Sequence, residues 1–340
     1  MTTSPYLSPG KLPHGLLDQL LRRFPPGDPR LIVGPQMGED AAVIDFGSTY
    51  LVAKTDPITF AADEIGWYAV NVNANDIAVM GATPRWFLAT ILLPEKTATA
   101  TLAEAIYTQI AGACDGLGVA LAGGHTEITV GLERPIVAGF MLGEVASERL
   151  VRSSGVQPGD ALILAGSIPI EGTALIAREK QAELLARGIA PALVRRAQDF
   201  LHDPGISVVR AARLAVETVA VHAMHDPTEG GLATGIWEVA QTSGVGVEID
   251  LDAVPVRAES KVVCDAFGLD PLGTIASGAL LLAVASGDAA RLLAAFGDTG
   301  LAAAVIGRAT ERGADLKAKR GGQEVAFPRF AVDEIARLFG

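Results

Sequence analysis

Acidic residues stand at the ends of predicted strands, where side chains from separate elements can meet. Glu39 and Asp40 come directly before the apolar run Ala41–Ile44, and Asp56 follows the strand-like run Tyr50–Lys54. An aspartate before proline also starts turns, so a turn explains each fragment at least as well when it is taken alone. Their chemical significance therefore depends on which other residues join them.

The run 64–80 has the length and spacing of a helix but carries polar residues in its middle. Asn71, Asn73 and Asn75 alternate there and Asp76 follows. Asparagine competes for backbone hydrogen bonds, and three of them in a helix interior cost about 1–2 kcal/mol relative to alanine. Asn71 and Asn75 are four residues apart and share a face, with Asp76 about 100° further round. We therefore expect a polar site on this helix.

A first glycine pair, Gly123-Gly124, follows a predicted short strand. Glycine lets a backbone approach a ligand closely, and His125, Thr126 and Glu127 then offer polar groups. A plain tight turn explains the pair equally well.

A second glycine pair, Gly230-Gly231, opens a predicted helix. Asp226 is expected to cap that helix, with Pro227 in its first turn and Glu229 completing a capping box. Capping does not require two glycines, which suit a phosphate approaching the free N–H groups. Both roles are compatible.

Common nucleotide and hydrolase motifs are absent from the sequence. There is no P-loop, no Gly-x-Gly-x-x-Gly after a strand and no Gly-x-Ser-x-Gly. His222 and His225 lack a cysteine or a third histidine nearby, and the two cysteines, Cys114 and Cys264, cannot form a four-ligand zinc site.

Predicted strands and helices alternate in both halves of the chain. In the first half, strands are expected at 41–44, 50–54, 87–93, 119–122 and 135–145, with helices at 64–80 and 102–117. In the second, strands are expected at 161–165, 218–224, 245–251, 279–284 and 302–307, with helices at 171–187, 191–201, 228–242, 289–296 and 331–339. A proline-rich arm at 1–30 is expected, then domains at 31–152 and 153–340, because the run around 152–160 is polar and turn-forming.

Composition narrows the class of protein. The 340 residues are 49% hydrophobic and 19% charged, which excludes a disordered chain. Apolar runs are too short for a membrane span of about 20 residues, and the N-terminus has no secretory pattern, so a cytoplasmic protein is expected. The net charge of −12 argues against nucleic-acid binding, and an acidic protein that binds a nucleotide needs Mg²⁺ between the charges.

Taken together, these stretches resemble the aminoimidazole ribonucleotide synthetase (PurM-like) superfamily, most closely its HypE-type hydrogenase-maturation branch. The matching stretches, in the family's order, are 38–43, 55–56, 75–84, 123–124 and 226–233. The resemblance implies an α+β fold of two domains, an N-terminal mixed αβ domain that forms a homodimer through its sheet and a C-terminal α/β domain. It also implies ATP in the cleft between them.

Residue roles follow from the same resemblance. It assigns Mg²⁺ and phosphate contacts to Asp40, Asp56 and Asp76, places Asp226 opposite them, and gives Asp40, Asp226 and Glu127 catalytic roles. Glu127 is expected as a metal ligand in place of the carboxylate that the family has where His125 stands, because neutral imidazole is a poor Mg²⁺ ligand. The remaining expected ATP-binding residues are Asn71, Asn75, Gly123, Gly124, His125, Thr228, Gly230 and Gly231.

The resemblance implies an ATP- and Mg²⁺-dependent enzyme that transfers the γ-phosphoryl group to an amide, carboxamide or phosphate oxygen of a small substrate. Two alternatives stay open: a non-catalytic ATP-binding scaffold that works with a maturation-protein partner, and a thiamine-monophosphate kinase-like enzyme. HypE ends in a reactive cysteine, whereas this chain ends Ala-Arg-Leu-Phe-Gly, so cyanide-forming chemistry is not expected.

Overall fold

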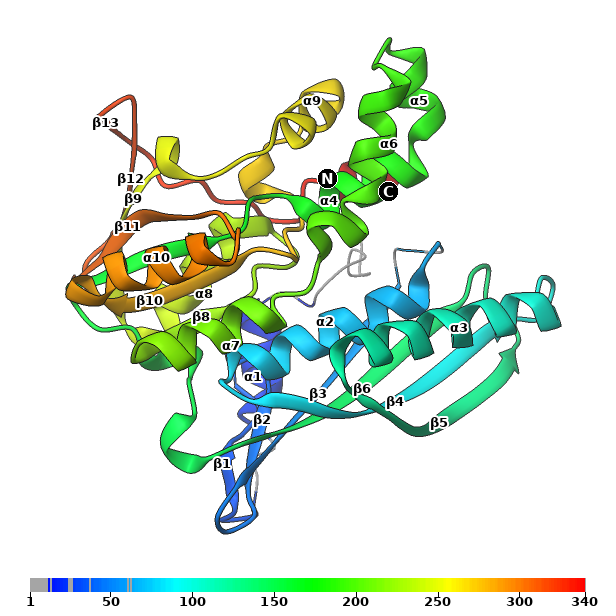
Figure 1. The fold of residues 1–340 in the computed structure, drawn as a ribbon, viewed down its shortest axis with the longest axis horizontal. Coiled ribbons are helices and arrows are strands. Elements are labelled where there is room, and N and C mark those ends of the chain that lie inside the picture. Colours follow the sequence, from blue (N-terminus) through cyan, green and yellow to red (C-terminus); the bar gives the residue numbers. More distant parts are fainter. Residues whose placement is uncertain are drawn as a thin grey trace.

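The structure, a computed structural model, describes residues 12, 14–23, 27–36, 38–59, 61 and 63–339. Its strands form a six-stranded sheet within residues 31–145 and a seven-stranded sheet within residues 160–325 (Figure 1). The predicted α+β class is confirmed. The predicted domain boundary after Arg152 falls between the sheets, in a segment with two short 3₁₀ turns, η1 (Ser147–Arg149) and η2 (Ser153–Gly155).

Residues 1–11 of the expected arm lie outside the described residues. The part of the arm that the structure describes holds helix α1 (His14–Leu21). No helix in the described ranges is both long and apolar enough to cross a bilayer.

The first sheet has the order β1-β2-β3-β6-β4-β5, and only β4 and β5 are parallel neighbours. Helices α2 (Ile65–Val79) and α3 (Ala100–Leu117) cover one of its faces (Figure 1). Its strands are β1 (Leu31–Val33), β2 (Ala42–Asp45), β3 (Tyr50–Ile58), β4 (Thr83–Pro94), β5 (Ala120–Thr129) and β6 (Ile136–Val145).

Helix α2 is the central element of the molecule. Every residue from Ile65 to Val79 except Trp67 is buried, because the first sheet and α3 cover one side and elements of the second domain, including α7, cover the other (Figure 1). A helix with no exposed face must direct its polar side chains at neighbouring elements. This is why Asn73 and Asn75 contact backbone segments outside the helix.

The second sheet has the order β13-β12-β9-β11-β7-β10-β8. Its strands are β7 (Asp160–Ala165), β8 (Val221–His225), β9 (Val245–Asp250), β10 (Leu280–Ala285), β11 (Ala303–Arg312), β12 (Leu316–Arg320) and β13 (Gln323–Val325). Its helices are α4 (Ile170–Glu179), α5 (Gln181–Ala186), α6 (Pro191–Asp199), α7 (Val209–Thr218), α8 (Gly231–Ser243), α9 (Ala258–Phe267), α10 (Ala289–Asp298) and α11 (Ala336–Phe339). Short turns η3 (Leu201–Gly205), η4 (Leu251–Ala253), η5 (Pro271–Gly273) and η6 (Ser286–Asp288) connect them.

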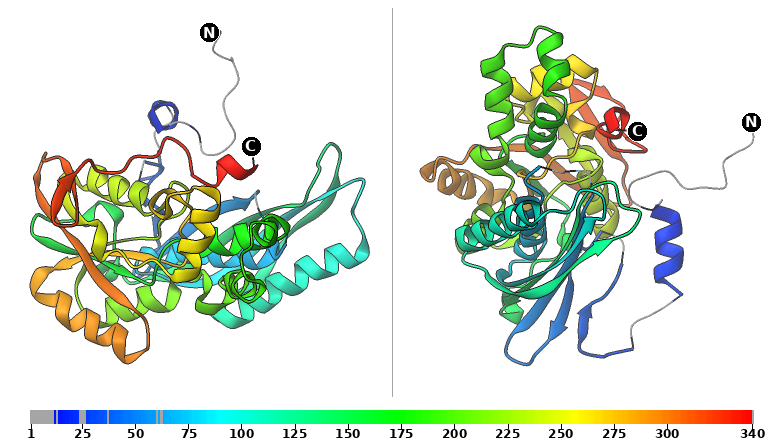
Figure 2. Two further views of the ribbon diagram at one scale, coloured as in Figure 1. Left: turned by 90° about the horizontal axis from the view of Figure 1, so that it is seen from above. Right: turned by 90° about the vertical axis from the view of Figure 1, so that its right-hand side faces the viewer.

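Several predicted elements are corrected by the structure. The helix expected at 171–187 is divided into α4 and α5 at Lys180, and the one expected at 331–339 shrinks to α11. Strands β1, β12 and β13 and helices α7 and α9 were not predicted. The C-terminal segment, red in Figure 2, instead crosses the second domain in extended form, and Ile335 is buried among residues of α4 and α6.

The first glycine pair lies inside a strand and not in a turn. Strand β5 runs through Gly123 and Gly124, whose φ values of 148° and 149° are open to glycine alone. A Cβ atom on Gly124 would lie 2.0 Å from the backbone oxygen of Ala89 on β4. The predicted strand end and tight turn are therefore wrong, and at Gly124 the residue type is set by close strand pairing.

Candidate functional site

Four carboxylates from separate elements gather where the two domains meet. Asp40 precedes β2, Asp56 lies on β3, Asp76 on α2, and Asp226 directly after β8; together they form what we call the carboxylate cluster. The charges of Asp40 and Asp76 both act on Asp226, so the cluster is continuous across the domain boundary.

Lys54 links the members that come from the first domain. Residues two apart on a strand share a face, so Lys54 and Asp56 of β3 both point towards α2. The Lys54 Nζ atom lies 3.3 Å from Asp76 Oδ2 and 3.7 Å from Asp56 Oδ2. Burial would lower the pKa of Lys54, but these carboxylates outweigh it and raise that pKa, so the lysine is charged. Burial raises the pKa of Asp76 to about 7 in spite of the lysine.

His225 is the second cation and joins the two domains. Its Nδ1 atom lies 2.9 Å from Asp40 Oδ1, and its Nε2 atom lies 3.3 Å from Glu238 Oε2 on α8. Burial opposes both charges, but their attraction raises the pKa of His225 well above its usual value and lowers that of Asp40. The Ser153 hydroxyl also donates to Asp40 Oδ2 at 2.8 Å. These contacts fix Asp40 against the second domain.

Asp226 has no structural role as a helix cap. Helix α8 begins at Gly231, its N-cap is Gly230, and no side chain caps it, so the predicted capping box at Asp226 and Glu229 is wrong. Both carboxylate oxygens of Asp226 are buried without a hydrogen-bond partner. Burial, followed by the charges of Asp76 and Asp40, raises its pKa well above the usual value. A carboxylate held this way is suited to a cation.

The donor set of the cluster fits a hard divalent ion. Among the residues that the structure describes, one group of three candidate ligands has its ligand atoms within 4.8 Å of one another, namely Asp40, His225 and Asp226. The imidazole Nδ1 is already held by Asp40, so the carboxylate oxygens are the available ligands. Oxygen donors of this kind match Mg²⁺.

The three asparagines of α2 have different roles. Asn75 donates to the Ile206 oxygen and accepts from the Val208 N–H, both at 2.8 Å, so its amide is used to join α2 to the second domain. The expectation that Asn75 faces ATP is corrected. Asn73 donates to the backbone oxygen of Asp56 at 3.1 Å and so positions that residue. Asn71 donates to the Trp67 oxygen at 2.9 Å within its own helix.

The second glycine pair is packed against the protein's own chain. The Gly230 N–H, predicted to meet a phosphate, donates to Asp333 Oδ2 at 2.6 Å. A Cβ on Gly231 would lie 2.5 Å from the Leu272 oxygen. The predicted phosphate site at this helix terminus is therefore corrected for Gly230 and Gly231, and no exposed phosphate-binding amide remains at Gly230. Thr228 lies in the preceding turn, two residues after Asp226.

The structure does not bring His125 and Glu127 to the carboxylate cluster. The register aligns His125 with Thr90, then Ala138, then Pro57, and residues aligned across strands share a face. His125 and Glu127 therefore lie on the face opposite Asp56. Strand β5 is also three strands away from β3, about 14 Å at the usual spacing.

Glu127 thus cannot share an ion with Asp56 within one chain, which corrects its predicted role. His125 Nε2 and Glu127 Oε2 instead lie 3.2 Å apart, with side chains 66% and 51% exposed. Gly123 lies on the same strand, whose continuation past the glycine pair was not predicted.

Sequence reasoning missed Lys54 and His225 as members of the site. A signal existed for each: Lys54 is two residues before Asp56 on a predicted strand, and His225 directly precedes Asp226. Spacing on a strand and neighbouring positions in the sequence do not identify the partner side chains, because Asp76 and Asp40 come from other elements.

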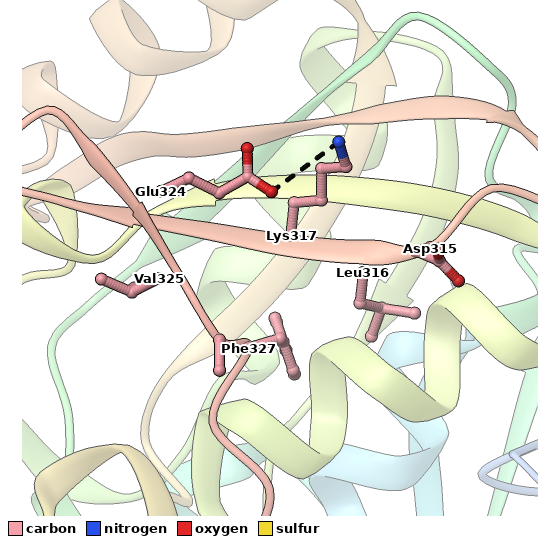
Figure 3. A pocket seen from close by; sticks show the side chains of 7 residues that line it. Asp315, Leu316, Lys317, Glu324, Val325 and Phe327 are labelled. Atoms are coloured by element: carbon pink, nitrogen blue, oxygen red, sulfur yellow. Dashed lines mark ion pairs between the residues drawn. The ribbon is translucent and has the colours of Figure 1, made fainter.

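A separate hollow lies on the second domain, between β12, β13 and the segment that follows (Figure 3). Lys317 and Glu324 form an ion pair of 3.8 Å across it, and Phe327 lies at its lower end (Figure 3). Strand β12 is five strands away from β8, about 24 Å at the usual spacing. This hollow is therefore remote from the carboxylate cluster.

Comparison with known proteins points to one family. Residues 38–145 match AIR synthase related protein, N-terminal domain, and residues 157–318 match AIR synthase related protein, C-terminal domain. A putative hydrogenase expression/formation protein of Methanocaldococcus jannaschii is 31% identical over 82% of this chain and 82% of its own length. Carbamoyl dehydratase HypE of Cupriavidus necator is 31% identical over 85% of this chain and 82% of its own.

A solved structure of the hydrogenase maturation protein HypE in complex with ATP has the same fold. Its TM-score is 0.70 at 25% identity, over 95% of this chain and 96% of the other.

Proposed function

The chain belongs to the AIR synthase related protein family, and from this premise we propose that it binds Mg·ATP at the carboxylate cluster and transfers the γ-phosphoryl group to a small acceptor. The observation that carries the proposal concerns Asp226. Its two carboxylate oxygens are buried without a hydrogen-bond partner, and the negative charges of Asp76 and Asp40 act on them. Uncompensated buried carboxylates are unfavourable unless a cation joins them.

The residues of the cluster have distinct proposed roles. Asp40, Asp76 and Asp226 would hold Mg²⁺, which when bound neutralises the phosphates of the nucleotide. Lys54 would contact a phosphate oxygen on the β3 side, and Asp56, with a side chain 39% exposed, would stand at the open edge of the site. His225 positions Asp40 through its Nδ1 atom. The protein thereby contributes position and charge and no covalent nucleophile.

The acceptor atom that we favour is a carboxamide oxygen. One relative is named a carbamoyl dehydratase, and phosphorylation makes a carboxamide oxygen a leaving group. Neither cysteine of this chain is suited to nucleophilic attack, because burial raises the pKa of Cys114 to about 11 and that of Cys264 to about 12. The substrate is therefore expected to be a separate molecule or a group on a partner protein.

Calorimetric titration with Mg·ATP tests the binding site. Asp76→Asn and Asp226→Asn each remove a carboxylate from the cluster and should weaken binding by about tenfold or more, equivalent to about 1.4 kcal/mol. Asp315→Asn, at the remote hollow, is the matched control and should stay within about twofold of the wild type. Unchanged affinity in both cluster variants would remove Mg·ATP from this site.

A scaffold that binds ATP without turnover is the second candidate, because one relative is named only as a putative hydrogenase expression/formation protein, without an activity. Phosphate release measured with and without a panel of small carboxamides separates the two. Acceptor-dependent release supports the enzyme, whereas tight Mg·ATP binding with slow release that no acceptor stimulates supports the scaffold. The thiamine-monophosphate kinase-like alternative and the cytoplasmic location stay predictions.

A further inference from the structure

A second group of buried polar side chains lies beside the carboxylate cluster. Glu171 is at the start of α4, Ser277 precedes β10, and Tyr68 lies on α2, with relative exposures of 6%, 1% and 1%. Glu171 Oε2, Ser277 Oγ and the Tyr68 hydroxyl are all buried without a hydrogen-bond partner. We call these three residues the Glu171 group.

The members of the Glu171 group are close to one another. The Glu171 N–H donates to the Ser277 backbone oxygen at 3.2 Å, and the Ser277 hydroxyl is close enough to the Glu171 carboxyl to lower its pKa, although burial outweighs this and raises it. The Glu171 charge is the largest influence of any charge on the Tyr68 hydroxyl. Tyr68 and Ile170, the neighbour of Glu171, belong to the same apolar core. The Glu171 carboxyl and the Ser277 hydroxyl thus lie together, and the Tyr68 hydroxyl of the first domain is near enough to feel the Glu171 charge.

The charge around this place is strongly negative. The carboxylates that act most on Glu171 are Asp333, Glu229 and Asp56. The nearby Arg178 of α4 is already bound to Asp63 and to the Gln198 oxygen. Asp56 belongs to the carboxylate cluster, so the Glu171 group and the cluster are linked through the Asp56 charge.

A metal ion does not fit this group. Within the described residues, the one set of three candidate metal ligands that lie close enough together contains Asp40, His225 and Asp226, and it excludes Glu171. Carboxylates spread more widely match a larger cation, whose N–H groups can reach separate acceptors.

Resting on the phosphoryl-transfer function proposed above, we infer that Glu171 and Ser277 bind a protonated nitrogen group, of the primary ammonium or amidinium type, on the acceptor molecule. The carboxylate Oε2 accepts from one N–H and the Ser277 Oγ from another. The acceptor's reactive oxygen then lies towards Asp56 and the nucleotide. The group would select acceptors by charge, at a point away from the reacting atom.

Saturation-transfer NMR titrations with three probes of similar shape test the inference. Benzylamine is an ammonium, benzamidine an amidinium and benzamide a neutral amide. At least one cationic probe should bind the wild-type chain at least fivefold more tightly than benzamide. Glu171→Gln should weaken that binding at least fivefold, and Ser277→Ala should weaken it by a smaller factor. The control is Glu179→Gln, which removes the same charge from the exposed end of α4 and should leave binding unchanged.

Equal binding of benzamide and the cations, or unchanged binding in both Glu171→Gln and Ser277→Ala, would overturn the inference and leave the group as a site of buried water. The titrations are made without nucleotide, so they do not depend on ATP binding. Mg·ATP calorimetry on Glu171→Gln should stay within about twofold of the wild type. Failure of the probes with intact Mg·ATP binding rejects this inference alone. Failure of Mg·ATP binding in the wild type rejects the proposed function, and probe binding would then show a cation site without an acceptor role.

Discussion

At the scale of single residues, Lys54 is one side chain that offsets the negative charge of the carboxylate cluster in the protein without a bound ion. Its ammonium lies between Asp76 and Asp56, and its side chain is 22% exposed. Removing one partner of a buried ion pair leaves the other charge uncompensated and costs about 3–5 kcal/mol, and partial exposure reduces that cost.

We expect Lys54→Met to destabilise the chain by about 2–3 kcal/mol in thermal or urea unfolding. Added Mg²⁺ should raise the melting temperature of the variant more than that of the wild type, because the ion replaces the lost positive charge. Lys96→Met, at an exposed position, is the control and should respond to Mg²⁺ as the wild type does. A variant that Mg²⁺ does not rescue would show that no divalent ion binds among these carboxylates.

Glu171 gives a pH-dependent prediction. Burial, with Asp333, Glu229 and Asp56 facing it, raises its pKa from 4.5 to about 7. The folded state therefore holds a proton that the unfolded state loses, so the contribution of Glu171 is most favourable below about pH 4.5 and is lost as the pH rises to about 7.

Glu171→Gln should accordingly stabilise the chain by about 2–3 kcal/mol at pH 8 and by little at pH 4.5. Urea unfolding of both proteins at the two pH values measures this. The Glu179→Gln variant should show no such pH dependence. A Glu171→Gln variant that is less stable than the wild type at pH 8 would mean that an ionised carboxylate is favourable in the folded protein.

At the scale of elements, the sequence was informative about α2 and uninformative about the glycine pairs. Three asparagines in an apolar helix predicted a polar site there, and the structure shows that each amide nitrogen donates to a backbone oxygen. Which amide meets the site and which one fastens a neighbouring segment depends on tertiary contacts, as Asn75 and Ile206 show. Spacing along the chain contains no information about those contacts.

The predictions made from the glycine pairs were wrong for a related reason. Glycine marks either a close approach or a positive φ, and the sequence does not say whether a ligand or another strand approaches. At Gly124 it is Ala89 of β4, and at Gly231 it is the backbone of η5. Sequence position also does not show that Asp226 leaves α8 uncapped or that Glu127 lies on the sheet face opposite Asp56. Asp226 was expected both to cap α8 and to act in the site, and only the described geometry separates the two roles.

The first glycine pair permits a matched test. Gly123 and Gly124 have φ values of 148° and 149°, so alanine suffers the same backbone strain at both. A Cβ atom at Gly123 meets nothing within 4 Å, whereas at Gly124 it meets Ala89 O at 2.0 Å. Gly124→Ala should therefore be the less stable variant by about 1–3 kcal/mol. Equal unfolding free energies would mean that strand β5 is displaced easily from β4.

At the scale of the whole molecule, none of the described helices covers one face of the first sheet (Figure 1). Helices α2 and α3 lie above β4, β5 and β6, and no described helix lies below these strands (Figure 1). Trp86 and Phe140 point to that uncovered face and are 37% and 44% exposed. Among the described strands, β5 is an edge strand with a neighbour on one side only. Exposed apolar surface next to an open strand edge is usually covered by another chain.

We therefore propose a homodimer joined through the first domain, as the family resemblance implied. Light scattering at micromolar protein should give about twice the 35.1 kDa of one chain. Phe140→Glu should shift the mass towards that of one chain, because a carboxylate is unfavourable in an apolar interface. Val305→Glu, at a position 40% exposed in the second domain, is the control and should remain a dimer.

The dimer also bears on His125 and Glu127, which lie on this uncovered face and cannot reach Asp56 in their own chain. If they serve the interface, then Glu127→Gln should weaken dimerisation in dilution experiments and leave Mg·ATP binding unchanged at saturating protein. A weaker Mg·ATP affinity at protein concentrations where the mass is still that of a dimer would instead mean that Glu127 acts on the nucleotide of a partner subunit. A wild-type mass of one chain at micromolar protein would reject the dimer and leave the uncovered face for another partner.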